Sequence, residues 1–330
     1  MLLLLAFYFW RLTRKHNLSD VISTLSNVNY TLLFLALFLM IISLAIKACR
    51  YYLLVNINFF NLPFYSFITP FLVGYSFSVL GPFKIGEVVS IEVNKQSRSI
   101  PRTNSIAALA VFRIFDLLIT LTIFAMSFIT TIPKVTPKNY HLLLFITFIV
   151  CIIGLILLGI VLFYPPIGRK LGHLLIKLLG LFSKKTRNFT EVKIMASIDM
   201  YYASLRTIIQ QKRITLLVFA MTITRWLIEF FAYQLTVYAF SIKIGYIDVC
   251  TISTISLFVG LLSMMPAGLG TSTLTSQALL EAMNAEPLQA AGAIICQSII
   301  GPGLIVLSGF IASLFIKKKR YTNKKSIDEN

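Results

Sequence analysis

The chain has 330 residues, of which 57% are hydrophobic and 13% are charged, and its mean hydropathy is +0.84. A soluble domain carries about twice this charged fraction, so the composition excludes one and predicts an all-α polytopic membrane protein. The formal net charge is +18, but the basic residues flank apolar runs instead of forming one block, which argues against nucleic acid as a partner. We expect membrane lipids with anionic headgroups as partners.

The chain starts with MLLLLAFYFWRLTRK, in which an apolar stretch of ten residues has no basic residue before it. It fits neither a signal peptide, which needs a positively charged start, nor a complete span of about 20 residues. We interpret it as a shortened first transmembrane segment, and a misassigned start codon is the alternative.

Longer apolar runs follow, and five of them approach the length needed to cross a hydrocarbon core about 30 Å thick. Two further runs are marginal or too short, and both end at glycine and proline. Together with the first segment, this pattern predicts about six spanning helices. The long runs are 30–46, 106–129, 142–163, 214–240 and 290–316, and the short runs are 64–80 and 252–265.

The first short run breaks at LGPFKIGEVV, residues 80–89, and the stretch from there to Asn94 is too short and too charged to span. We therefore predict a re-entrant helix pair that opens inward. Lys84 and Glu87 at its tip would form a charge pair on the side where a substrate enters, and Gly86 belongs to the same tip.

The segment 165–213 contains ten basic residues and two acidic ones, so we place it in the cytoplasm together with the basic tail 317–330. Apolar and basic positions alternate at helical spacing within 167–209, which predicts an amphipathic connector on the inner membrane surface. We expect the N- and C-termini in the cytoplasm and the protein in the plasma membrane of a prokaryote.

The second short run leads into MMPAGLGTST, residues 264–273. Both basic segments stay cytoplasmic only if residues 252–283 enter and leave by the same face, as a re-entrant pair opening outward or as two crossings. Proline and glycine would make the tip, and hydroxyl groups would cap the second helix, whose free N–H groups favour an anion. A kinked ordinary helix is the alternative. The candidate binding residues are Gly268, Gly270, Thr271, Ser272, Thr273 and, further along, Gln277.

The predicted organisation is therefore span, hairpin, span in residues 30–129 and again, with opposite orientation, in residues 214–316. Both lie in a single transmembrane domain, residues 1–330. Inverted repeats with broken helices are the architecture of alternating-access transporters.

Ionisable side chains inside apolar runs are costly, so each is a functional candidate. Arg113 and Asp116 in VFRIFDLLIT are three residues apart, and Arg225 and Glu229 in TRWLIEFF are four apart, so each pair shares a helix face. Either the pairs neutralise each other and lock helix packing, or the arginines bind a phosphate. In the second interpretation the carboxylates hold the arginines in place or exchange a proton when the phosphate leaves.

No pattern indicates a cofactor or a metal. The cysteines are scattered, without a CxxC pair or a histidine at ligand spacing, so we expect neither disulfides nor a metal site. Walker loops, Ser-His-Asp sets and the paired aspartates of nucleotide-sugar transferases do not occur. These observations favour a transporter without a cofactor over an enzyme.

Four motifs occur in the order and spacing of a known family: CRYYLL with Arg50, LGPFKIGEVV, FRIFDLL and MMPAGLGTST. Over residues 27–315 the chain resembles the lysylphosphatidylglycerol synthase transmembrane-region family, also called flippase-like integral membrane proteins. Its members include the membrane half of the bacterial multiple peptide resistance factor, which carries aminoacylated phosphatidylglycerol between leaflets, and archaeal proteins tied to dolichol-linked sugar metabolism. The resemblance implies that this protein binds or translocates an anionic or lipid-linked substrate.

The resemblance is incomplete at two motifs. The family pattern GGxGxxE has Ala267 here in place of its first glycine and Thr273 in place of its glutamate, and Phe112 replaces an acidic residue before Arg113. Because no aminoacyltransferase domain follows the membrane region, we do not expect the chain to make lysylphosphatidylglycerol alone.

The leading hypothesis is translocation of an anionic phospholipid or polyprenyl-linked lipid between leaflets. One alternative is a membrane enzyme or accessory factor in lipid-linked glycan or aminoacyl-lipid metabolism, in which the same charged residues act on a lipid phosphate. A non-catalytic scaffold is a third. A homo-oligomer or a partner enzyme is compatible with all three.

Overall fold

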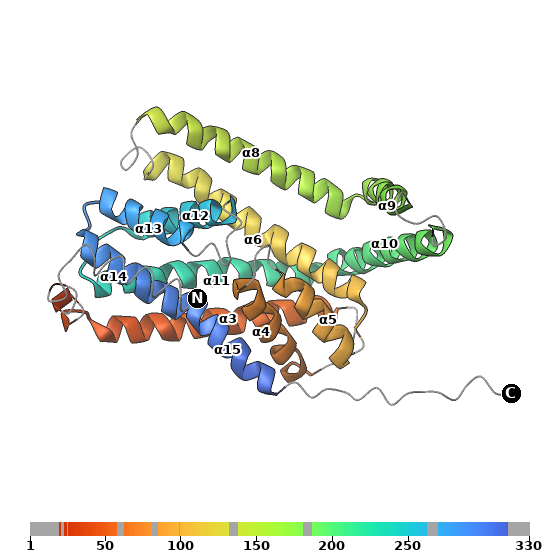
Figure 1. Ribbon diagram of the computed structural model, residues 1–330, viewed down its shortest axis with the longest axis horizontal. Helices are drawn as coiled ribbons and strands as arrows, with labels where there is room; N and C mark the ends of the chain where they lie inside the picture. Colours follow the sequence, from red (N-terminus) through yellow and green to blue (C-terminus); the bar gives the residue numbers. More distant parts are fainter. Residues whose placement is uncertain are drawn as a thin grey trace.

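A computed structural model describes most of the chain, and every regular element in the described part is a helix (Figure 1). The all-α prediction is thus confirmed for residues 20, 23–24, 26–57, 63–80, 85–98, 100–131, 138–180, 187–262 and 270–315. The helices are α3 (Tyr30–Asn56), α4 (Tyr65–Leu80), α5 (Gly86–Arg98), α6 (Arg102–Thr130), α8 (Lys138–Phe163), α9 (Pro165–Gly180), α10 (Arg187–Gln210), α11 (Lys212–Ala239), α12 (Tyr246–Leu262), α13 (Thr271–Ala282), α14 (Pro287–Ser298), the π-helical turn η3 (Ile299–Gly303) and α15 (Leu304–Leu314).

Several helical segments are long and apolar enough to cross a membrane. The sequence predicted about six spans, whereas the described residues hold four, or five if the bent pair α8 and α9 is one of them. The predicted first segment lies outside the described residues. The four segments are Tyr30–Asn56, Arg102–Ser127, Lys212–Ala239 and Pro287–Leu314.

The bent pair is interrupted at Tyr164, where α9 leaves α8 at 87°. Two prolines cause this break. The residue before a proline is pushed out of the helical region, so α8 ends before Pro165, while proline is well tolerated in the first turn of α9. The predicted end of the apolar run at residue 163 is therefore confirmed as a helix end.

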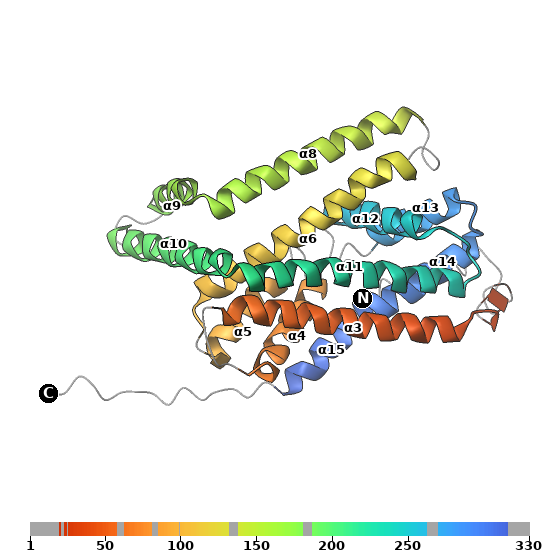
Figure 2. The same ribbon diagram turned by 180° about the vertical axis from the view of Figure 1, so that it is seen from behind.

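Helices α3 and α11 lie side by side and antiparallel through the centre of the molecule (Figures 1 and 2). The start of α3 meets the end of α11, where the Asn29 amide donates to the Ala239 carbonyl at 3.0 Å. Ala36 and Ala232 are completely buried between them. Small side chains let two backbones approach closely, which is how helices associate in membranes.

The two short runs form two packed helix pairs, α4 with α5 and α12 with α13. Their tips, residues 81–84 and 263–269, lie outside the described residues. In the second pair, Ser276 Oγ donates to Ser256 Oγ at 2.8 Å. In one continuous helix these residues would be about 30 Å apart, so the alternative of a kinked ordinary helix is wrong.

Glycine makes the first pair possible. A Cβ atom added at Gly86 would collide with the backbone of Gly74 and Ser78, so α5 approaches α4 more closely than any side chain at this position would allow. Gly86, predicted as a binding residue, thus has a packing role in the structure.

The last candidate span contains a proline in its interior. Pro302 lies in η3, where the helix widens by a π-turn before it continues as α15. Such a local adjustment satisfies the backbone around a proline within a membrane helix. Further along, Gly309 packs directly against Ser76 of α4.

The described part of the predicted connector, residues 165–213, forms α9 and α10. Tyr201 and Tyr202 of α10 donate to the carbonyls of Leu162 and Val161 at 3.0 and 2.9 Å, which ties α10 to the end of α8. Arg169 of α9 also pairs with Asp199 of α10. That these helices lie on the inner membrane surface stays a prediction.

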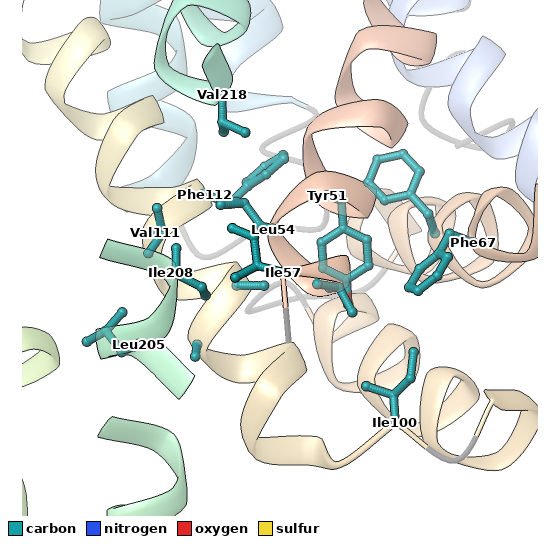
Figure 3. Packing of buried hydrophobic residues seen from close by; sticks show 14 of the residues in the cluster. Tyr51, Leu54, Ile57, Phe67, Ile100, Val111, Phe112, Leu205, Ile208 and Val218 are labelled. Atoms are coloured by element: carbon teal, nitrogen blue, oxygen red, sulfur yellow. The ribbon is translucent and has the colours of Figure 1, made fainter. Parts of the chain in front are cut away.

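Two hydrophobic cores lie at the two ends of the α3–α11 pair. The first fills the space where the C-terminal half of α3 meets α4, α6 and α10 (Figure 3). The second surrounds the start of α3 and the end of α11. The first contains Tyr51, Phe67, Phe112 and Ile208, and the second contains Val237, Ile252, Leu280 and Ile294. The charged side chains described next lie along the helices between these cores.

Candidate functional site

Five ionisable side chains meet among α3, α6 and α11, and we name them the central ionic cluster: Lys47, Arg50, Asp116, Arg225 and Glu229. Each lies well inside a candidate span. Charged side chains at such positions are expensive and mark functional sites by default.

Asp116 accepts hydrogen bonds from two arginines on two other helices. Nη1 and Nη2 of Arg50 both lie 3.3 Å from its Oδ1, and Nη2 of Arg225 lies 3.0 Å from the same oxygen. The predicted pairing of Asp116 with Arg113 is therefore wrong. Arg113 turns to α5, where its Nη2 pairs with Oε1 of Glu87.

Glu229 is held on both carboxylate oxygens. Arg225 Nη1 donates to Oε2 at 2.7 Å, so the predicted pair across one helical turn is confirmed. On the other oxygen, Lys47 Nζ and Ser43 Oγ each lie 2.5 Å from Oε1. Lys47 also donates to the hydroxyl of Tyr75 at 2.9 Å.

The cluster has more positive than negative charge. Three cations, Lys47, Arg50 and Arg225, face two carboxylates, Asp116 and Glu229, which leaves one positive charge in excess. Arg50 is completely buried and Arg225 is 3% exposed. The Nε–H groups of both have no partner among the described residues. Because unpaired buried donors are rare and costly, the cluster is suited to receive an anionic acceptor.

Aromatic rings support all three cations. The guanidinium of Arg50 lies 4.2 Å from the ring centroid of Phe112, and that of Arg225 lies 4.0 Å from Trp226. Lys47 Nζ lies 5.0 Å from the centroid of Tyr75. A ring covers the face of a guanidinium and leaves its edge for hydrogen bonds, so the rings help to orient the N–H donors of Arg50 and Arg225.

The Glu87–Arg113 pair joins the first turn of α5 to α6. Arg113 is on the same helix as Asp116, one turn away, and its Nε is also buried without a described partner. This pair therefore connects the first helix hairpin to the helix that carries Asp116. Lys84, the predicted partner of Glu87, lies outside the described residues.

Helix α13, the second helix of the α12–α13 pair, starts at Thr271. The N-cap residue is Gly270, so a hydroxyl of this motif does not occupy the cap position as predicted; Thr273 in the first turn accepts from the Gly270 amide at 3.1 Å. Gly270 has φ 103°, in the region that glycine tolerates best. Gln277 donates to Glu281 at 2.7 Å. Helix α13 packs on α12 and α14. The binding role of Thr271, Ser272 and the other residues of this motif stays a prediction. Gly268 lies outside the described residues.

Sequence reasoning missed Lys47, Ser43 and Tyr75. The apolar run was predicted to end at residue 46, before Lys47 and before Arg50, which was a candidate binding residue. Helix α3 instead continues to Asn56, because YYLLV after Arg50 is again apolar and aromatic. That resumption of apolar residues is the signal that would have placed both cations inside the span.

No three His, Cys, Asp or Glu side chains come together as a metal site in the described part of the chain. The charged groups of the cluster are arranged as ion pairs, with donors in excess. What this arrangement can do chemically is bind an oxyanion through guanidinium N–H groups.

Comparison with known proteins identifies two similarities. The family model described as "Lysylphosphatidylglycerol synthase TM region" matches residues 1–309, which include every helix that contributes to the cluster. A UPF0104 membrane protein of Methanocaldococcus jannaschii is 25% identical over 314 residues, which cover 92% of this chain and 90% of that protein.

Proposed function

Because the chain belongs to the lysylphosphatidylglycerol synthase transmembrane-region family, we propose that it binds an anionic phospholipid or polyprenyl-linked lipid and moves it between leaflets. The central ionic cluster binds the headgroup. The observation that carries this proposal is the excess positive charge of the cluster, together with the buried Nε–H groups of Arg50 and Arg225, which have no partner among the residues that the structure describes.

An anionic headgroup relieves what is unfavourable in the cluster. A buried cation without a compensating charge costs several kcal/mol, and a buried donor without an acceptor costs about 1–3 kcal/mol more. One negatively charged phosphate oxygen offsets the excess charge and accepts from the free guanidinium edges. Arginine suits this task because its planar fork matches a phosphate.

The packing of the helices supports the inverted repeat. The two central helices α3 and α11 pack on each other, and contacts elsewhere come in corresponding sets. Helix α4 packs on α5 and on α15, as α12 packs on α13 and on α6. Likewise α5 contacts α6, as α13 contacts α14. These corresponding contacts support the proposal that residues 30–129 and 214–316 form an inverted repeat, the arrangement expected for alternating access around a central site.

The lengths of the short helices favour re-entrant hairpins. Helix α4 has 16 residues, α5 has 13 and α13 has 12, so they extend roughly 18–24 Å, less than a hydrocarbon core of about 30 Å. We propose that both hairpins enter and leave by one face, and that together with the first segment the chain has about six spans.

The distribution of basic residues supports a plasma-membrane location with both termini in the cytoplasm. Helices α9 and α10, with basic residues such as Lys170 and Lys177, lie against the inner leaflet. Membrane lipids are the partners that this chemistry fits.

Leaflet exchange of a fluorescent anionic phospholipid in reconstituted liposomes tests the proposal. We expect wild-type protein to accelerate exchange, and Arg50→Gln and Arg225→Gln to slow it at least about tenfold, since each removes charged hydrogen bonds from the headgroup. Arg169→Gln is the matched control: it makes the same change at a side chain that is 59% exposed on α9, and it should exchange like wild type.

The outcomes of this experiment also separate translocation from the alternative of an enzyme or accessory factor. Folded wild-type protein that exchanges none of several anionic lipids would overturn translocation. Altered lipid-linked sugars or aminoacyl lipids in cells lacking the protein would then favour an enzyme or accessory factor. Equal rates of lipid exchange by Arg225→Gln and wild type would show that the headgroup does not bind at the central ionic cluster.

A further inference from the structure

The two carboxylates of the central ionic cluster are held very differently. Glu229 uses both oxygens and has three donors, Arg225, Lys47 and Ser43, at 2.5–2.7 Å. The hydrogen bonds that reach the Asp116 carboxylate from described side chains all end on Oδ1, at 3.0–3.3 Å. Thr120, the other side chain that bonds to this residue, donates to its backbone carbonyl.

These distances rank the two carboxylates by strength of attachment. Charge-assisted N–H···O bonds between full charges are typically about 2.7–2.9 Å long. The bonds to Glu229 are at or below this range, whereas those to Asp116 are longer, and one carboxylate oxygen is shared by three N–H groups. Glu229 is therefore the more tightly held carboxylate, and Asp116 is the carboxylate that is easier to displace.

The two arginines that donate to Asp116 are also held by other contacts. Arg225 is held by Glu229 and by the ring of Trp226, and Arg50 is held by the ring of Phe112. Within the described part of the chain, the Nε–H of each arginine also has no hydrogen-bond partner, so the two guanidinium groups carry more donors than Asp116 satisfies. A tetrahedral oxyanion has more acceptor oxygens than a carboxylate, so it can accept hydrogen bonds from more of these N–H donors.

We infer that Asp116 occupies, in the unloaded protein, the position of the anionic oxygen of the ligand, and that the ligand binds by replacing it on Arg50 and Arg225. This inference rests on the proposed binding of a headgroup and assigns the regulation of that site. The ligand is an oxyanion, such as the phosphate of a lipid headgroup. Asp116 returns to the arginines when the ligand leaves, so the cations are compensated in both states.

This role has a signature that a purely structural ion pair lacks. Removal of a competing carboxylate strengthens ligand binding, and it also slows release, because no carboxylate is available to take the arginines back. Removal of an anchoring carboxylate weakens binding, because the donors lose their positions. Asp116 and Glu229 thus form a matched pair of variants with the same charge change and opposite expected effects.

The experiment compares wild type, Asp116→Asn and Glu229→Gln, purified in detergent micelles that contain phosphatidylcholine and phosphatidylglycerol. Native mass spectrometry measures the phosphatidylglycerol that each variant retains. We expect Asp116→Asn to retain it at about tenfold lower concentration than wild type while leaflet exchange becomes slower, and Glu229→Gln to lose retention. Asp116→Glu keeps the competing charge and should bind like wild type.

A second arm replaces the lipid with inorganic phosphate and measures binding by calorimetry. Tighter phosphate binding by Asp116→Asn with no change in lipid retention would identify free phosphate as the ligand. If Asp116→Asn does not fold, Asp116→Ser removes the same charge in a smaller side chain.

The outcomes separate this inference from the proposed function. If wild type exchanges lipid but Asp116→Asn binds no more tightly than wild type, Asp116 is not a competitor, and the inference is overturned while translocation stands. If no variant exchanges lipid but Asp116→Asn binds phosphate more tightly, translocation falls and the role of Asp116 stands.

Discussion

Arg50 of α3 and Arg225 of α11 donate to the same oxygen, Oδ1 of Asp116, although the two arginines belong to different halves of the chain. Two like charges are thereby held together in the interior of the helix bundle. Such an arrangement persists only if the surrounding carboxylates offset the repulsion and the loss of hydration. The stability of the bundle therefore depends on a few identifiable contacts.

Glu229→Gln should destabilise the protein strongly. The change leaves Lys47 and Arg225 buried without their main counter-ion, and breaking a buried pair in this way costs about 3–5 kcal/mol. Reversible unfolding in mixed micelles measures the loss. Asp199→Asn, which removes a carboxylate from an exposed pair with Arg169, should change the free energy of unfolding by less than about 1 kcal/mol. Equal losses in both variants would contradict the buried pairing.

Lys47 and Glu229 should be energetically coupled across α3 and α11. Lys47→Met removes the cation that Glu229 compensates, so the double variant with Glu229→Gln should be more stable than the sum of the two single losses predicts. A coupling energy of about 0.5–3 kcal/mol is expected for side chains in contact. The same micelle unfolding assay completes the double-mutant cycle. Strictly additive losses in unfolding free energy would contradict the contact between Lys47 and Glu229.

Arg113 should be coupled to Glu87 more strongly than to Asp116. The structure pairs Arg113 with α5, although Asp116 is only one turn away on its own helix. Two double-mutant cycles, Arg113→Gln with Glu87→Gln and Arg113→Gln with Asp116→Asn, measure this difference as unfolding free energies. A larger coupling energy in the second cycle would show that Arg113 pairs with Asp116, as their spacing along the helix suggests, and would contradict the structure.

Gly86→Ala should disrupt the first helix hairpin. The added Cβ would meet the backbone of Gly74 and Ser78, and backbone atoms cannot move aside as a flexible side chain can. A loss of about 1–3 kcal/mol or more is expected from such overpacking. Gly159→Ala on α8 is the control, because a Cβ there meets no atom within 4 Å, and alanine has the higher helix propensity. A neutral result for Gly86→Ala would show that α4 and α5 are not this close.

Lys170 and Lys243 should be accessible from opposite sides of the membrane. Lys170 lies on α9, Lys243 follows the candidate span α11, and both are exposed. In a variant whose native cysteines are replaced by serine, single cysteines at these positions are labelled with a membrane-impermeant maleimide in intact cells. We expect labelling at 243 only, and labelling of both or of 170 alone would contradict the proposed topology.

The membrane class and most helix boundaries follow from the sequence because they depend on local properties. Hydropathy is summed along the chain, and proline and glycine in the sequence mark the helix breaks at Pro165 and before Gly86, although Pro70 and Pro302 lie inside helices. The Arg225–Glu229 pair was predictable for the same reason, since residues four apart share a helix face.

The partners of Asp116 depend on tertiary packing. Spacing along α6 offers it Arg113, but the approach of α3 and α11 brings Arg50 and Arg225, while α5 draws Arg113 to Glu87. The apolar run was predicted to end before Lys47 because hydropathy alone does not reveal that a helix continues past a charged residue whose counter-ion lies on another helix. The sequence by itself thus determined that Arg113, Asp116, Arg225 and Glu229 lie in apolar runs. Only the tertiary structure decided which charged side chains meet, because contacts between side chains are set by how the helices pack.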